Sequence, residues 1–311
     1  MTDRTGAHVG ADIGGTKTAA VLCGDDGAIL AKTWIEHDPN RSEPIEDRIL
    51  RAVRKVTAGA SELRVRSLGV SVAGLISHDN RTIVHAATLG AQNLHLADWL
   101  EARHPGRFTI VNDANATLVG HLSEEDPDHR NVVLLSLGTG IGGAVAVDGA
   151  VVHGGHGFAA ELGHLTVDFD DPRRCLCGAP GCVENYASGR GLVEMAAEAG
   201  IGTGASSYDS RSLIALAVED SRARGIIEHA GAMLGRAIAQ LGTVLDPEEF
   251  VIGGSVGHAA ADLLLPAART EMAARWPFAH VRPLPEVRVD AIGPYAAAIG
   301  AARIARNHDT L

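Results

Sequence analysis

The sequence lacks any apolar run of about 20 residues, so we expect no segment of it to span a bilayer. Its first residues, MTDRTGAH, are polar and charged and do not have the composition of an export signal. Basic residues are in deficit, with 27 Lys and Arg against 38 Asp and Glu and a net charge of −11. This balance argues against nucleic acid or an anionic membrane as a partner. We therefore expect a cytoplasmic protein.

Cysteine is also scarce, which makes its distribution informative. Three of the four cysteines, Cys175, Cys177 and Cys182, lie in the run CLCGAPGCVE, and His164 precedes them in ELGH. Thiolate sulfur and imidazole nitrogen are ligands that zinc prefers, and four of them form a closed tetrahedral site. Glycine at two positions lets the backbone fold tightly enough to aim the sulfurs at one point. The spacing alone supports the cysteines more directly than His164.

The cysteine run could instead hold a disulfide with one thiol left over, or a group of buried, inert thiols. A cytoplasmic setting disfavours a disulfide. The segment is rich in Pro, Gly and Arg, which is untypical of a core, so we favour a zinc site. Carboxylates stand on both sides of the run, at Glu161 and Glu184. The metal would therefore tie two acidic side chains to one place.

The two halves of the chain share a pattern. In the first half, the apolar strand AHVGADI is followed by a turn at Gly14-Gly15 and a second strand, KTAAVLC. In the second half, NVVLLSLG is followed by a glycine turn over 138–143 and a hairpin in AVAVDGAVV. Each half then alternates helices with strands, which predicts a duplicated α/β unit with a cleft between the halves. We expect a small N-terminal α/β domain over 1–116 plus 294–311 and a larger α/β domain, carrying the zinc motif, over 117–293.

Hydrophobic periodicity places the other elements along the chain. Apolar runs predict strands at 28–36, 67–74, 107–111 and 250–254. Apolar stripes at helical spacing predict helices at 43–60, 97–104, from 113 onward, 189–199, 211–220, 224–245, 258–275 and 294–307. The stretch TGASSYDSRS, at 203–212, is of low complexity and predicts a surface loop.

The first glycine turn has the composition of a phosphate-binding loop. Gly14 and Gly15 leave room for a phosphate beside the backbone N–H groups, while Thr16 offers a hydroxyl and Lys17 a charge. Asp12, at the end of the strand, can hold Mg²⁺ through water. The GxxxxGK[ST] spacing of a Walker loop is absent. An ordinary hairpin turn is the alternative.

The second glycine turn matches GxGxxG after a strand. A dinucleotide fold needs a helix to open at that turn, whereas the residues that follow here predict a second strand. We therefore expect another strand–turn–strand phosphate loop, so that two loops grip one nucleoside triphosphate. Gly253 and Gly254 follow the strand FVI and precede a helix, which is a ligand-proximal position in an open α/β sheet.

Asp113 follows the strand FTIV and starts a helix in the sequence Asn112-Asp113-Ala114-Asn115. The carboxyl end of a strand is where open α/β folds place their ligands, so Asp113 is a candidate catalytic base. Asp and Asn are also common helix caps, and the local sequence alone favours the cap. The base assignment depends on the phosphate loops lying beside it.

Together these motifs resemble those of the ROK family of bacterial sugar kinases, and among them the glucokinases and N-acetylmannosamine kinases. The matching runs follow the family's order over nearly the whole chain and are ADIGGTKT, VNDANA, LSLGTGIGG, GFAAELGH, CLCGAPGCVENYASGR and VIGGS. The cysteine run is highly specific, whereas each glycine turn alone is not. The resemblance implies a two-domain, duplicated ribonuclease-H-like fold of the actin-like ATPase and hexokinase type, with sugar and ATP in the interdomain cleft.

The resemblance also implies a role for individual residues. Asp113 resembles the catalytic base. The zinc ligands, with zinc in a structural role, are His164, Cys175, Cys177 and Cys182. The sugar-binding positions are Gly74, Asn93, Asn112, Asp113, Glu161, His164 and Glu184. The positions that contact ATP and its Mg²⁺ are Asp12, Gly14, Gly15, Thr16, Lys17, Thr139 and Gly140 at the phosphates and Gly253 and Gly254 at the adenosine.

The implied activity is transfer of the γ-phosphoryl group of ATP to the 6-hydroxyl of a hexose, with glucose as the first candidate. An N-acetylmannosamine or N-acetylglucosamine kinase and a fructokinase are alternatives. The chain has Ala73-Gly74 and Gln92-Asn93 where the family usually has Pro-Gly and often Pro-Asn, and both changes lie on the sugar side. A sugar-sensing regulatory protein without a DNA-binding domain and a polyphosphate-using kinase are further alternatives. We expect a homodimer or a higher homo-oligomer.

Overall fold

The computed structural model describes residues 6–38, 43–103, 106–124, 129–202, 209–277 and 279–307. The chain divides into two compact units. Unit 1 comprises Met1–Asp128, His153–Ala159 and Ile292–Leu311, and unit 2 comprises His129–Val152 and Ala160–Ala291. Each contains both strands and helices, so the expected α/β class is confirmed. The domain bounds expected from the sequence, 1–116 plus 294–311 and 117–293, remain a prediction.

Unit 1 is built on a five-stranded mixed sheet with the order β3-β2-β1-β4-β8. The first three strands of the chain pair antiparallel, whereas β4 and β8 continue the sheet parallel to β1. The strands are β1 (Gly6–Ile13), β2 (Lys17–Gly24), β3 (Ile29–Glu36), β4 (Arg64–Val72) and β8 (Arg107–Asn112).

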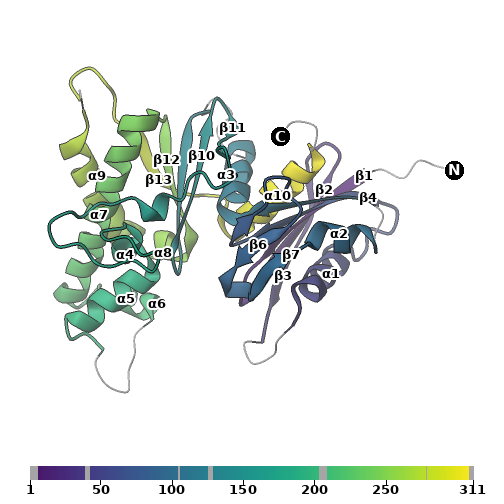
Figure 1. Ribbon diagram of the computed structural model, residues 1–311, viewed down its shortest axis with the longest axis horizontal. Coiled ribbons are helices and arrows are strands. Elements are labelled where there is room, and N and C mark those ends of the chain that lie inside the picture. Colours follow the sequence, from purple (N-terminus) through teal and green to yellow (C-terminus); the bar gives the residue numbers. More distant parts are fainter. Residues whose placement is uncertain are drawn as a thin grey trace. The chain divides into compact units, whose positions relative to one another are not determined.

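Helices cover both faces of this sheet, because its central strands bury both of their faces. In β2, Ala20 and Leu22 join the core beneath α1 and α2, whereas Val21 and Cys23 join the core beneath α10. This alternation is the period of two that a strand imposes on its side chains. The helices are α1 (Ile45–Val56), α2 (Leu96–Glu101), α3 (Asp113–Glu124) and α10 (Ala296–Arg306), with the 3₁₀ turn η3 (Gly293–Tyr295) before α10 (Figure 1).

Helix α10 packs directly on the backbones of β1, β4 and α3. Gly10 in β1 and Gly69 in β4 lie beneath it, and a Cβ added at either position would overlap backbone atoms of α10. Gly300 makes a similar approach from the helix, since its Cβ would overlap the carbonyl group of Ala116 in α3. Close packing of backbone on backbone therefore requires glycine at these positions.

Unit 1 also contains a small antiparallel sheet that the sequence analysis did not predict. Its order is β5-β6-β7, and it comprises β5 (Leu75–Ile76), β6 (Ile83–Ala86) and β7 (Ala91–Leu94), with the 3₁₀ turn η1 (Ala87–Leu89) before β7. Such short strands give too few side chains to show an alternating pattern. The sheet matters for the site, because Gly74 immediately precedes β5 and Asn93 lies in β7.

Unit 2 repeats the sheet topology of unit 1. Its order is β11-β10-β9-β12-β13, with β9, β10 and β11 antiparallel and with β12 and β13 parallel to β9. Order and direction match the first sheet strand by strand, so the predicted duplication is confirmed. The strands are β9 (Val132–Leu137), β10 (Ile141–Val147), β11 (Ala150–Val151), β12 (Glu249–Gly253) and β13 (Glu286–Val289).

The helices of unit 2 share one large core with this sheet. They are α4 (Glu184–Ala187), α5 (Gly189–Glu198), α6 (Ser210–Leu216), α7 (Ser221–Leu245), α8 (Gly254–Ala259) and α9 (Ala261–Arg275), together with the 3₁₀ turn η2 (Leu162–His164). The expected helix over 211–220 ends early, because Asp220 caps the N-terminus of α7. The expected helix over 258–275 is two helices, separated where Ala260 turns the chain with ψ 2°.

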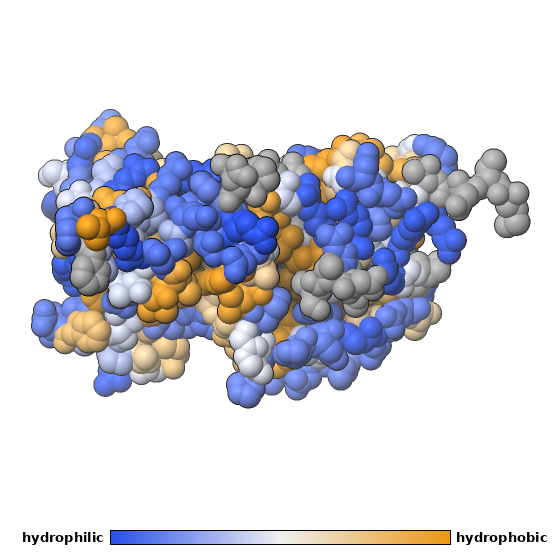
Figure 2. Space-filling view, turned by 90° about the horizontal axis from the view of Figure 1, so that it is seen from above, coloured by the Kyte–Doolittle hydropathy of each residue, from blue (hydrophilic) through white to orange (hydrophobic). Residues whose placement is uncertain are grey.

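Part of the loop expected over 203–212 lies outside the described residues, and its final residues begin α6. None of the described helices is long and apolar enough to cross a bilayer. The face shown in Figure 2 is mainly hydrophilic, with apolar side chains in small groups.

Replacing Gly300 with Ala is expected to destabilise the protein, because the new methyl group would overlap the backbone of α3. Overpacking of this kind costs about 1–3 kcal/mol. The matched control is Gly225→Ala in α7, where the added Cβ has no neighbour within 4 Å and should stabilise the helix by about 0.5–1 kcal/mol. Thermal and urea unfolding measure both changes. A Gly300→Ala variant as stable as the parent would contradict the close packing of α10.

Candidate functional site

The first glycine turn connects β1 to β2 in unit 1. The amide of Gly14 donates to the carbonyl of Lys17 at 2.8 Å and closes the turn. Arg48 of α1 donates from Nη1 to the carbonyls of Gly14 and Gly15 at 3.2 and 3.3 Å. Gly15 and Thr16 are exposed. The turn is therefore held from the α1 side while its tip stays open to solvent. Sequence reasoning missed Arg48, because its contact spans more than thirty positions of the chain.

Asp12 and Lys17 stand at the two ends of this turn. The hydroxyl of Ser71 donates to Oδ1 of Asp12 at 2.7 Å. Burial raises the pKa of Asp12, while the Ser71 hydrogen bond and the Lys17 charge act in the opposite direction. The ammonium of Lys17 lies 4.6 Å from the ring centroid of Trp34, in the geometry of a cation–π contact. A carboxylate and a positioned cation thus flank the exposed turn.

The cap of α3 is Asn112, not Asp113. Oδ1 of Asn112 accepts from the amides of Ala114 and Asn115 at 2.9 and 3.2 Å, which are bonds that an N-cap side chain makes. The cap that the local sequence favoured for Asp113 therefore belongs to its neighbour. Asp113 is the first residue of α3 and is half-buried. The helix dipole stabilises the ionised form of a carboxylate at this position.

Gly74 connects the loop before the small sheet to this helix start. Nδ2 of Asn112 donates to the carbonyl of Gly74 at 3.1 Å. A side chain at Gly74 would collide with the backbone of His85 in β6. Asn93 is exposed and has a left-handed φ of 49°, a conformation that Asn tolerates better than most residues and that is common at binding sites. Asn112 therefore joins the predicted base to the loop carrying Gly74.

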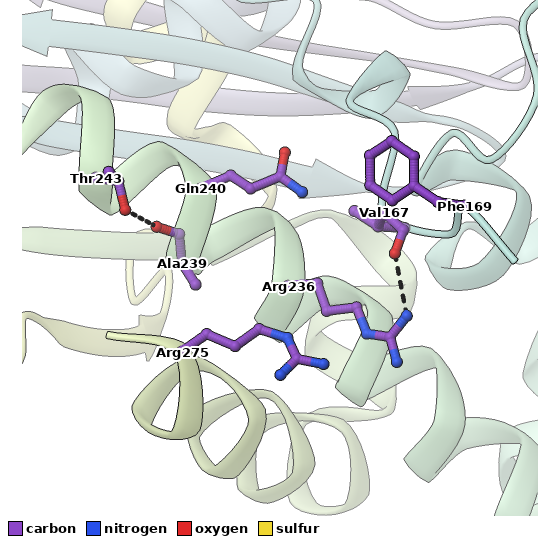
Figure 3. Close-up of a pocket in the computed structure, with 7 residues that line it drawn as sticks. All are labelled: Val167, Phe169, Arg236, Ala239, Gln240, Thr243 and Arg275. Atoms are coloured by element: carbon purple, nitrogen blue, oxygen red, sulfur yellow. Dashed lines mark hydrogen bonds between the residues drawn. The ribbon is translucent and has the colours of Figure 1, made fainter. Parts of the chain in front are cut away.

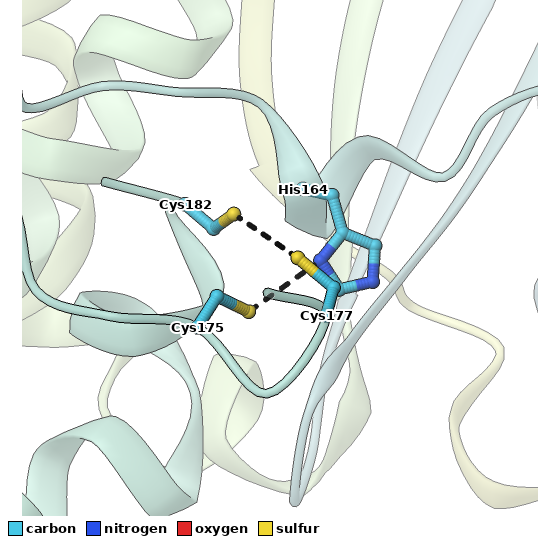
Figure 4. Close-up of side chains that lie close together, drawn as sticks. All are labelled: His164, Cys175, Cys177 and Cys182. Carbon is cyan, nitrogen blue, oxygen red and sulfur yellow. Dashed lines mark hydrogen bonds between the residues drawn. The ribbon is translucent and has the colours of Figure 1, made fainter. Parts of the chain in front are cut away.

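In unit 2, His164, Cys175, Cys177 and Cys182 point towards one another (Figure 4). Their four ligand atoms all lie within 4.8 Å of one another. The Sγ atoms of Cys177 and Cys182 are 3.7 Å apart, and Sγ of Cys175 is 3.7 Å from Nδ1 of His164. A tetrahedral centre with metal–sulfur bonds of about 2.3 Å has edges of roughly 3.7 Å. The three cysteines form no disulfide, so the geometry fits a metal site instead.

The loop that carries these ligands is shaped by local bonds. The amide of Gly178 donates to the carbonyl of Cys175 at 3.0 Å, and Gly178 itself has a φ of 95° that only glycine adopts readily. Burial and the neighbouring sulfurs raise the pKa of Cys182 to about 12, whereas the amide of Ala179 lowers the pKa of Cys177. A bound cation would stabilise the negative charges of several neighbouring thiolates, so that all three cysteines could be deprotonated at once.

The base of the loop is tied to helices α4 and α5. The guanidinium of Arg173 binds both carboxylate oxygens of Glu198 at 2.7 Å, and its backbone amide donates to the hydroxyl of Tyr186 at 3.0 Å. That hydroxyl in turn donates to Oδ2 of Asp168 at 2.8 Å. These bonds fix the ends of the loop independently of any ion.

His164 has a second ring nitrogen that faces away from the sulfurs (Figure 4). Its Nδ1 lies against Cys175, so its Nε2 can take another partner. Glu161 is exposed and immediately precedes the short turn that carries His164, whose amide donates to the carbonyl of Glu161 at 3.1 Å. The cysteine loop thus orients the imidazole of His164, and a backbone hydrogen bond connects this residue to Glu161.

The second glycine turn joins β9 to β10. Because β10 is a strand antiparallel to β9, the prediction of a strand–turn–strand loop instead of a dinucleotide fold is confirmed. The amide of Ile141 donates to Oε2 of Glu184 at 3.0 Å. A Cβ at Gly140 would come within 2.6 Å of the same oxygen, so a larger residue would displace the carboxylate. Glu184 therefore lies directly against the turn.

Arg190 is a site residue that sequence reasoning missed. Its Nη2 donates to Oε1 of Glu184 at 2.8 Å, and its backbone amide donates to the carbonyl of Thr139 at 3.3 Å. It lies in the first turn of α5, whose N-cap is Ser188. The motif CLCGAPGCVENYASGR ends on Arg190, but the spacing alone does not reveal that its side chain turns back to Glu184.

Gly253 and Gly254 lie where β12 meets α8. Gly254 has a φ of 81°, and a Cβ there would overlap the carbonyl of Leu137 at the end of β9. His258 braces this turn, since Nδ1 contacts the carbonyl of Gly254 at 2.8 Å and Nε2 that of Asp290 at 2.9 Å. A cavity of about 510 Å³ adjoins it and is lined by Asp209, Ser210, Arg211, Ile214, Ser255, Val256, His258 and Ala259.

A second, smaller cavity of unit 2, about 260 Å³, lies between α7, α9 and the chain at Val167 (Figure 3). Two arginines, Arg236 and Arg275, point into it, and both bind Oε1 of Glu271, at 3.0 and 2.8 Å. None of the residues predicted to bind sugar, ATP or metal lines this cavity. It is therefore separate from the candidate site.

Comparison with known proteins agrees with the resemblance. A model of the ROK family matches residues 8–308. A glucokinase from Halalkalibacterium halodurans is 32% identical, over 96% of this chain and 94% of its own length. An N-acetylmannosamine kinase from Shigella boydii is 32% identical, over 82% of this chain and 84% of its own length. The crystal structure of a ROK family glucokinase from Streptomyces griseus, in complex with glucose and AMPPNP, has a TM-score of 0.80 at 30% identity and covers 96% of this chain and 99% of that one. The expected fold class is thereby confirmed.

Purified protein is expected to contain about one tightly bound, thiolate-preferring divalent ion per chain, because four suitable ligand atoms converge on one point. Elemental analysis by mass spectrometry measures the ion and its stoichiometry. Cys177→Ser should lose it and should lower the melting temperature. Cys23→Ala is the matched control, since Cys23 lies in β2 of the other unit and should leave the metal content unchanged. Metal-free protein with an intact Cys177 would count against the site.

Proposed function

This chain belongs to the ROK family, and on that premise we propose that it is an ATP-dependent sugar kinase that phosphorylates the 6-hydroxyl of a hexose, with glucose as the first candidate. The observation that supports this most is the likeness, over nearly the whole of both chains, to a glucokinase structure that holds glucose and an ATP analogue. The glucokinase relative of similar identity points to the same substrates.

Asp113 acts as the general base. Its carboxylate accepts the proton of the sugar hydroxyl while that oxygen attacks the γ-phosphorus of ATP, and ADP leaves. General base catalysis contributes about 10²–10⁴-fold to such a reaction. The position of Asp113 supports this assignment, because it is the first residue of α3 and directly follows the carboxyl end of β8, where open α/β folds place their ligands.

Phosphoryl transfer depends mainly on alignment and on charge neutralisation. The two glycine turns supply backbone N–H groups, with Gly15 and Thr16 in the first and Thr139 and Gly140 in the second. The amide of Gly14 closes the first turn, and its lack of a side chain leaves room for a phosphate. Lys17 adds a positive charge, and Arg48 holds the first turn in its shape. Mg²⁺ accompanies ATP and neutralises its phosphates, with Asp12 placed to hold it through water.

The sugar is recognised through its hydroxyl groups by side chains that accept or donate hydrogen bonds. Asn112, Glu161, His164 and Glu184 make these contacts, with Gly74 and Asn93 adding to them. The residues that would hold zinc are His164, Cys175, Cys177 and Cys182. With four protein ligands the metal would order this loop and take no part in the reaction. Nδ1 of His164 would bind the metal, which would leave Nε2 to bind a sugar hydroxyl.

The adenosine end of ATP binds at Gly253 and Gly254. The adjoining cavity of about 510 Å³ supports this placement, because it is large enough for a nucleoside and is lined by α6 and α8. Ser210, Arg211 and Ser255 offer polar groups to a base or a ribose, and Ile214 and Val256 offer apolar surface.

An N-acetylmannosamine kinase is the second candidate, favoured by a relative of equal identity to this chain. The departures at Ala73 and Gln92 lie on the sugar side, beside Gly74 and Asn93, and bear on the choice of sugar without touching the base or the phosphate turns. A cytoplasmic location, where ATP is abundant, and assembly into a homodimer or a higher homo-oligomer are parts of the same proposal.

Asp113→Asn should lower kcat by about 10²–10⁴-fold and leave the KM for sugar within a few-fold, because the amide keeps the size of the side chain but accepts no proton. A coupled ADP-release assay measures both constants. Asp262→Asn, also in the first turn of a helix, controls for the loss of a charge at a helix N-terminus and should be near normal. Near-normal turnover in folded Asp113→Asn protein would remove the base assignment.

The same assay with glucose, mannose, fructose, N-acetylglucosamine and N-acetylmannosamine decides among the substrates. We expect the highest kcat/KM with glucose, and a higher value with N-acetylmannosamine would select the second candidate. If none of these sugars raises the rate of ADP release above the sugar-free rate, the kinase proposal is wrong and a sugar-sensing protein is favoured. Replacing ATP with inorganic polyphosphate tests the phosphoryl donor.

A further inference from the structure

We infer that Arg190 is a positioning residue that couples sugar binding to nucleotide binding through Glu184 and the second glycine turn. The inference rests on the proposed function, because it takes Glu184 as a sugar ligand and the turn as a phosphate loop. All of the residues that carry it lie in unit 2. Its basis is a chain of hydrogen bonds that the sequence motifs do not disclose.

The two oxygens of Glu184 have different protein partners. Oε2 accepts a hydrogen bond from the amide of Ile141 at 3.0 Å, and Oε1 accepts one from Nη2 of Arg190 at 2.8 Å. The side chains of Glu184 and Arg190 are 16% and 23% exposed. Partial burial and charge make these bonds stronger than those of a surface ion pair.

Glu184 keeps capacity for a ligand in this arrangement. A carboxylate offers about four lone-pair positions, and the amide of Ile141 and the guanidinium of Arg190 use two of them. Sugar hydroxyls can therefore bind the same group that already holds the backbone of the turn. A shift of Glu184 when sugar binds would therefore also shift Ile141, the first residue of β10.

Two hydrogen bonds of Arg190 restrain the connection between Glu184 and the turn. Its side chain holds Oε1 of Glu184, while its backbone amide holds the carbonyl of Thr139 at 3.3 Å. The preceding residue, Gly189, also binds the turn, since its amide donates to the carbonyl of Gly138 at 2.8 Å. The start of α5, Glu184 and the turn are thus one bonded cluster, and ordering any member by a ligand orders the others. Coupling of this kind is reciprocal between the two ligands.

The first test is the affinity for AMPPNP with Mg²⁺, measured by titration calorimetry without glucose and with saturating glucose. We expect glucose to tighten AMPPNP binding about five-fold or more in the parent protein. Arg190→Ala should bring that factor close to one, and Arg190→Lys should restore part of it. Arg236→Ala is the matched control, since Arg236 is 30% exposed and binds Glu271 at 3.0 Å but does not contact the turn.

The second test needs no sugar. Glu184→Ala should weaken AMPPNP binding about tenfold, the size expected for losing one hydrogen bond to a charged group. Glu161→Ala removes another carboxylate predicted to bind sugar, but one without a bond to the turn, and should leave AMPPNP affinity unchanged. Melting temperatures establish that each variant is folded.

The outcomes separate the inference from the proposed function. A folded Arg190→Ala protein with the parent's coupling factor, or a Glu184→Ala protein with the parent's AMPPNP affinity, would overturn the inference while leaving a sugar kinase in place. A parent protein that binds none of the five hexoses would overturn the proposed function. In that case the sugar-free titration of Glu184→Ala still decides whether the carboxylate positions the turn.

Discussion

The parallel pairing of β1, β4 and β8 determines which predicted site residues of unit 1 lie close together. In that register Asp12 pairs with Ser71, and Val72 pairs with Asn112. Main-chain hydrogen bonds thus bring together the carboxyl ends of three strands that are far apart in the sequence, as open α/β sheets generally do around ligands. Unit 2 repeats the arrangement, since Gly253 pairs with Ser136 next to the second glycine turn.

Within this frame, neighbouring residues divide the work between structure and chemistry. Asn112 accepts hydrogen bonds from two amides of α3 and donates one to the carbonyl of Gly74, so it fixes the start of the helix that carries Asp113. The cysteine loop shows the same division, because Nδ1 of His164 turns towards the sulfurs and the other nitrogen turns away. In both places a polar group orders the backbone beside a residue that is predicted to bind a ligand.

The elements that the sequence predicts well are those whose signal is local. The strands beside the two glycine turns and the duplicated order of the sheets follow from apolar runs and turn residues. The small sheet carrying Asn93 escapes prediction, because its strands are too short for a pattern. The break at Ala260 and the early end of α6 escape it as well, since side-chain periodicity continues where the backbone turns.

The candidate site follows the same rule. The cysteine spacing predicts a cluster that the structure assembles. The contacts made by the side chains of Arg48, Arg190 and His258 cannot be read from sequence spacing, so they become visible only once the chain is folded. The cap at Asn112 is an intermediate case: two adjacent residues had suitable side chains, and only the backbone geometry decides which one is used.

Helix α10 has a consequence for the order in which the protein is made. It supplies one face of the core of unit 1, yet it is encoded after all of unit 2. At a synthesis rate of about 5–20 residues per second, roughly 10–30 s separate α3 from α10 on the ribosome. During that interval Gly10 and Gly69 present bare backbone where the helix will later lie, so the nascent N-terminal sheet has one apolar face uncovered until α10 has been synthesised.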